Sequence, residues 1–132
     1  MSLRAGIRIG AAIAMILAAC SPASGTPGDA AVGLTASSSG VCQAIIALPD
    51  VSAAERSFTN VAHDPLHVLA AEPGLDRQLA AGILETMQKV EADFGQSPPP
   101  DVAALTSDLR SLRDSADRAL VSLGRVAPPC AR

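Results

Sequence analysis

Aromatic residues are almost absent from this sequence of 132 residues, which contains no tryptophan, no tyrosine and two phenylalanines, Phe58 and Phe94. Sites for carbohydrates and for unpaired bases usually stack their ligands on aromatic rings, so neither kind of site is expected. Basic residues are also in deficit, with ten against thirteen acidic residues. A nucleic-acid-binding protein normally carries a basic footprint. The composition therefore argues against a nucleic-acid partner.

Motifs that carry catalysis are missing as well. The sequence contains neither a Gly-x-Ser-x-Gly elbow nor a glycine-rich phosphate loop. A nucleophile needs a positioned base, and no pattern here supplies one. Acidic pairs such as Glu91 with Asp93 are typical of solvated helix faces. We therefore expect a protein that is not an enzyme and uses no cofactor.

The apolar run near the start, Ile9 to Ala19, is too short to cross a membrane. As a helix its 11 residues would span about 16 Å, roughly half of a hydrocarbon core. Arg4 and Arg8 precede it without any acidic residue, which is typical of a secretory signal peptide. The sequence Leu17-Ala18-Ala19-Cys20 then resembles the lipobox of bacterial lipoproteins.

This resemblance implies cleavage before Cys20, a diacylglyceryl group on its thiol, and further acylation, for example with palmitate, of its amine. Two acyl chains would hold the protein with on the order of 20 kcal/mol, on the extracytoplasmic face of the cell membrane. Removal of residues 1–19, which hold two arginines and no acid, would leave 113 residues with a net charge of −5. The alternatives are an ordinary signal peptide with an unmodified Cys20, or an uncleaved anchor.

Two further cysteines, Cys42 and Cys130, form an even pair in a protein expected to be exported. Such a pair predicts a disulfide, which would enclose 89 residues. Loop-closure entropy makes a bridge of that length worth about 4–5 kcal/mol. Two free thiols are the alternative.

Three parts are expected along the chain. Residues 1–19 form the signal peptide, and residues 20–40 form the lipidated cysteine and a flexible tether. The segment 21–40 is rich in serine, glycine, alanine, threonine and proline, without an apolar period. As a flexible coil it would hold the folded domain, residues 41–132, about 25 Å from the anchor.

Apolar periodicity in residues 41–132 predicts an all-α fold, a small antiparallel helical bundle. Two long helices are expected at 75–94, from an apolar stripe, and at 101–123, from heptad spacing. The heptad stripe could face a partner helix, but we expect it to face the protein's own core. Shorter, broken helices are expected before these two, at 41–48 (or a buried strand), 53–62 and 66–71.

Local signals place the ends of the short helices. Ser52 and Glu55 match a capping box, which predicts that a helix starts at residue 53. Asp64 and Pro65 are a favourable N-cap and first helical residue, so we expect one helix to end and another to begin there.

His63 and His67 are the only histidines, and they stand four residues apart. Two histidines at that spacing on one helix can share a metal ion. The helix break expected at Pro65 would separate the two rings, and Glu72 is the only third ligand in view. We therefore expect no metal site and keep His63 and His67 as candidate ligands.

Three functions fit these observations. The first is a membrane-anchored, non-catalytic module that docks a protein partner or the envelope. The second is a carrier of a small apolar ligand in a cavity between helices, lined by Ile83, Met87 and Leu109. The third is a metal-binding or sensing protein that uses His63 and His67. A filled core would argue against the carrier.

Overall fold

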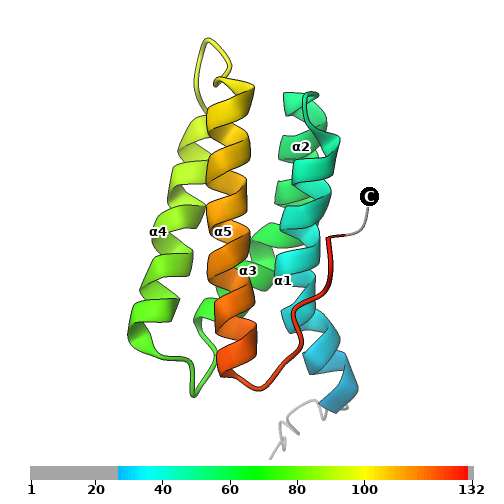
Figure 1. Ribbon diagram of the computed structural model, residues 1–132, viewed down its shortest axis with the longest axis vertical. Coiled ribbons are helices and arrows are strands. Elements are labelled where there is room, and N and C mark those ends of the chain that lie inside the picture. Colours follow the sequence, from blue (N-terminus) through cyan, green and yellow to red (C-terminus); the bar gives the residue numbers. More distant parts are fainter. Residues whose placement is uncertain (1–26, 131–132) are drawn as a thin grey trace, which may run out of the picture.

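The computed structural model describes residues 27–130, and every regular element in this part of the chain is a helix (Figure 1). Helix α1 (Pro27–Ala47) precedes a bent helix made of α2 (Val51–Ser57), a π-helical turn η1 (Phe58–Ala62) and α3 (His63–Ala70). The long helices α4 (Arg77–Phe94) and α5 (Val102–Ser122) follow. The predicted all-α bundle is confirmed.

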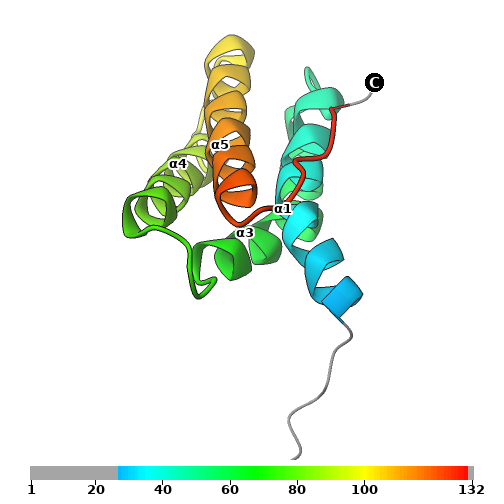
Figure 2. The same cartoon turned by 60° about the horizontal axis from the view of Figure 1, so that its bottom comes forward.

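The helices pack around one core. Helices α4 and α5 lie side by side and antiparallel, and α5 also packs against α1 (Figure 1). Helix α1 packs along all three pieces of the bent helix. Figure 2 shows α3 lying between α4 and α1, where it contacts both. The fold thus brings the end of the bent helix against α4.

The two long helices start and end within two residues of the predicted positions. Asp76 caps α4 by accepting a hydrogen bond from the backbone N–H of Gln78 at 2.8 Å, and Asp101 caps α5 in the same way. The apolar stripes of both helices face the core. Their fully buried members are Ile83, Met87, Val90, Leu105, Leu109, Leu112, Ala116 and Ala119. The heptad stripe therefore packs within the protein, as expected, and does not face a partner helix.

Helix α1 begins at Pro27, so the expectation of a flexible tether over residues 20–40 is wrong for residues 27–40. Leu34, Ser37 and Ser38 are buried in contact with the rest of the bundle. The Ser37 hydroxyl donates to the Leu34 carbonyl at 2.6 Å, and the Ser38 hydroxyl donates to Asp117 Oδ1 at 2.5 Å. Because tertiary packing outweighs weak helix propensity, the folded domain begins well before residue 41.

Gly40 explains why small residues are needed in this part of α1. A Cβ atom at Gly40 would lie only 2.8 Å from the Cα and backbone nitrogen of Ala62. Only glycine therefore lets α1 approach the π-helical turn this closely.

Helix α2 starts two residues earlier than the capping box predicted. Asp50, and not Ser52, is the N-cap, and its side chain accepts a hydrogen bond from the Ala53 N–H at 2.9 Å. Ser52 is exposed in the first turn. An aspartate was available two residues upstream, and aspartate and serine are comparably good caps.

The predicted disulfide between Cys42 and Cys130 is confirmed. The Cα atoms of the two cysteines are 5.6 Å apart, within the usual range. After α5 the chain turns back and runs along α1 to reach Cys42 (Figure 1). Arg113 holds this returning segment by donating a hydrogen bond to the Pro128 carbonyl at 3.1 Å.

Candidate functional site

The bent helix does not break at Pro65, contrary to the sequence prediction. Proline lacks an N–H, and in a regular α-helix its ring collides with the carbonyl four residues earlier. The turn just before Pro65 is π-helical, and the His63 N–H bonds to the Phe58 carbonyl, five residues back. This wider turn lets the helix continue through the proline, so Asp64 is not a helix cap. His63 and His67 therefore lie on the same face, one turn apart.

Three potential metal ligands converge at this point. The ring centroids of His63 and His67 are 4.8 Å apart, and His63 Nε2 lies 3.1 Å from Glu91 Oε1. Glu91 belongs to α4, which α3 contacts. One ligand atom from each of the three side chains lies within 4.8 Å of the other two.

Asp64 orients the His63 ring. Its Oδ1 atom lies 3.1 Å from His63 Nδ1, on the side of the ring opposite to Glu91. Both ring nitrogens of His63 thus face a carboxylate oxygen. When a metal ion replaces the contact between Nε2 and Glu91, the carboxylate of Asp64 would hold a proton on Nδ1 and so leave the Nε2 lone pair for the metal. Metal-binding histidines commonly have such a carboxylate behind them.

The spacing of the three side chains fits a small transition-metal ion. Ligand atoms arranged tetrahedrally about 2 Å from Zn²⁺ are about 3.3 Å from each other. The three candidate ligand atoms are at most 4.8 Å apart, so modest side-chain rotations would bring all three to bonding distance of one ion. The site is accessible, because His63 and Glu91 keep 34% and 39% of their side-chain surface exposed. A pocket of about 290 Å³, with Phe58 and Phe94 in its wall, adjoins these two residues.

The sequence alone identifies two of the three candidate ligands. Glu72, the third ligand considered there, lies outside the cluster, and Glu91 takes that place. The local sequence predicts that Glu91 belongs to a solvated helix face. Nothing in its local pattern marks it, because only the packing of α3 against α4 brings it to His63.

The three residues that were expected to line a ligand carrier's cavity are part of the packed core. Ile83, Met87 and Leu109 are buried together in the core cluster. The pocket beside the histidines and the larger one between α1 and α5 are both lined by other residues.

The signal peptide, the lipobox-like sequence and Cys20 lie outside the described residues. Within residues 27–130, none of the helices combines the length and apolar character needed to cross a membrane. Comparisons with protein-family models, with curated proteins and with solved structures find no match for this chain.

Proposed function

We propose that the protein is a lipid-anchored, non-catalytic module on the extracytoplasmic face of the cell membrane, which binds Zn²⁺ or Cu²⁺ through His63, His67 and Glu91. The convergence of these three side chains carries the metal-binding part of the proposal. The lipobox-like sequence ending at Cys20 supports the anchor.

The ligand set favours this chemistry. Imidazole nitrogens and a carboxylate suit Zn²⁺ and Cu²⁺, whereas Ca²⁺ and Mg²⁺ prefer oxygen ligands alone. Three protein ligands leave at least one coordination position for water or for a group from another molecule. A protein partner that supplies this fourth ligand would combine metal binding with the docking role expected from the sequence.

Isothermal titration of the untagged protein with ZnCl₂ tests the metal site. We expect one Zn²⁺ per chain with a dissociation constant of about 1 µM. Glu91→Gln should weaken binding at least about tenfold, because the carboxylate ligand is lost. Glu85→Gln changes an exposed glutamate of the same helix and should bind like the wild type. Equal affinity of the Glu91→Gln variant would contradict the proposal.

Membrane fractionation of the Cys20→Ala variant tests the anchor separately. The wild type should be found in the membrane fraction, and the variant should lose both the acyl groups and the membrane association. An unchanged membrane fraction with unchanged electrophoretic mobility would show that no lipid is attached to Cys20.

A further inference from the structure

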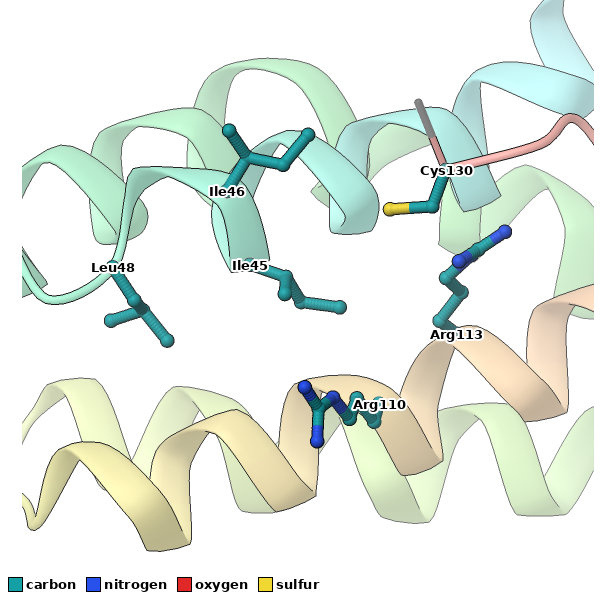
Figure 3. Close-up of a pocket in the computed structure, with 6 residues that line it drawn as sticks. All are labelled: Ile45, Ile46, Leu48, Arg110, Arg113 and Cys130. Atoms are coloured by element: carbon teal, nitrogen blue, oxygen red, sulfur yellow. The ribbon is translucent and has the colours of Figure 1, made fainter. Parts of the chain in front are cut away.

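A groove of about 530 Å³ lies between the end of α1 and α5 (Figure 3), on elements that take no part in the metal cluster. Its volume is within the range of small-molecule sites. The residues that line it are Ile45, Ile46, Leu48, Arg110, Arg113 and Cys130. Ile45 and Leu48 point toward α5 in Figure 3, and Ile46 is 47% exposed. One wall is thus apolar, and the facing wall carries two guanidinium groups.

The two arginines differ in how their charges are balanced. Arg113 donates to the Pro128 carbonyl, and its Nε lies 3.6 Å from Asp117 Oδ2, so its charge has a partner. Arg110 is exposed and forms no ion pair within the part of the chain that the structure describes. The groove therefore holds one uncompensated positive charge, in a protein of negative net charge.

We infer that this groove binds a single fatty acid, with its carboxylate at Arg110 and its acyl chain along Ile45, Ile46 and Leu48. A carboxylate carries one negative charge, which matches the single unpaired guanidinium, and it can accept two parallel hydrogen bonds from it. A phosphate monoester fits less well, because it carries almost two negative charges at neutral pH and would leave one of them without a partner. The acyl chain would remove exposed apolar surface from water, at about 25 cal/mol per Å².

The methyl resonances of the isoleucines can show directly whether a ligand binds in the groove. In a chain that begins at residue 21, the only isoleucines are Ile45, Ile46 and Ile83. This chain retains residues 27–130, which make every contact described above. With ¹³C-methyl-labelled isoleucine, Ile45 and Ile46 report on the groove, while Ile83 in the core serves as an internal control.

Titration with octanoate should shift the methyl resonances of Ile45 and Ile46 and leave that of Ile83 in place. Arg110→Gln should weaken octanoate binding at least about tenfold, the usual size for the loss of a charged hydrogen-bond partner. Arg125→Gln is the matched control, since Arg125 is exposed and does not line the groove. It should bind octanoate like the wild type.

Three results would overturn the inference. One is the absence of any shift at about 1 mM octanoate, the weakest affinity consistent with a specific site. Another is that octyl glucoside or octyl phosphate binds as tightly as octanoate or more tightly, since the match between one carboxylate and the charge of Arg110 would then not determine binding. The third is a shift of Ile83 as large as that of Ile45, which would place the ligand in the core.

Discussion

Gly40 sets the distance between α1 and the π-helical turn. Replacement by alanine would force its Cβ against the backbone of Ala62, and backbone atoms cannot move aside as a flexible side chain can. We predict that Gly40→Ala lowers the free energy of unfolding by about 1–3 kcal/mol, measured by urea denaturation followed by circular dichroism.

Gly33, in the same helix, is the matched control. A Cβ atom at Gly33 would have no neighbour within 4 Å. Gly33→Ala should therefore raise the free energy of unfolding by up to about 1 kcal/mol, through helix propensity alone. If both variants changed stability by the same amount, the close approach at Gly40 would not be the reason for the glycine.

Substitution of Asp64 tests whether its contact with the His63 ring matters for metal binding. Its side chain is 95% exposed and touches His63, so its loss should leave the stability within about 0.5 kcal/mol of the wild type. Asp64→Asn should nevertheless weaken Zn²⁺ binding about tenfold, as is usual for a residue behind a metal ligand. Asp114→Asn, at an exposed position of α5, should not change the affinity. An unchanged affinity in the Asp64→Asn variant would remove Asp64 from the site.

At the scale of helices, the contact between α4 and α5 contains two carboxyl groups whose pKa values are shifted in opposite directions. Lys89 donates to Asp108 Oδ1 at 2.5 Å, and this hydrogen bond lowers the pKa of the Asp108 carboxyl. Burial raises the pKa of Asp93, and the neighbouring Asp108 raises it further. The Asp93 Oδ2 atom is buried without a hydrogen-bond partner within the described residues.

Opposite pH dependences follow for these two aspartates. The stability contributed by Asp93 is fully present below its ordinary pKa of 3.8 and is lost as the pH rises through the raised value. The contribution of Asp108 is present above 3.8 and is lost as the pH falls through the lowered value.

We therefore predict that Asp93→Asn gains thermal stability relative to the wild type between pH 3.8 and neutral pH. Asp108→Asn should be less stable than the wild type at neutral pH, with a deficit that shrinks in acid. Melting temperatures from circular dichroism at several pH values measure both. Parallel pH profiles for the two variants would contradict this assignment of the charges.

The elements that could be predicted from the sequence are those with a strong apolar period. In α4 and α5 the period is carried by large side chains such as Ile83, Met87 and Leu109, and both helices were predicted within two residues. Helix α1 was largely missed because the part before Val41 packs through small residues such as Ser37 and Gly40, which also typify linkers. The π-helical turn was missed because Pro65 usually ends a helix, and local sequence does not reveal how a wider turn admits it.

At the scale of the whole molecule, the disulfide joins the first and last described parts of the fold. Cys42→Ser/Cys130→Ser removes the bridge without leaving a free thiol at either position. We predict a loss of about 4–5 kcal/mol in the free energy of unfolding, because the unfolded chain regains the entropy of an open 89-residue loop. Urea denaturation measures this loss, and reduction of the wild type should reproduce it. A change below about 1 kcal/mol would show that the bridge adds little.

The candidate metal site belongs to this scale as well. The spacing of His63 and His67 is visible in the sequence, but Glu91 follows His67 by 24 residues and meets it only after α3 has packed against α4. The proposed lipid anchor is the reverse case, since it rests on the sequence up to Cys20 alone. The metal-binding part of the proposed function thus depends on tertiary packing, and the anchoring part depends on local sequence.

The most direct test of that function uses the two histidines themselves. Because the chain has no others, an imidazole ¹⁵N spectrum of the untagged protein contains only the two rings of the proposed site. On addition of Zn²⁺, both rings should shift, and His63 should keep a proton on Nδ1, toward Asp64, while Nε2 binds the metal. If both rings stay unchanged in excess Zn²⁺, or if Glu91→Gln responds as the wild type does, the three side chains do not form a metal site.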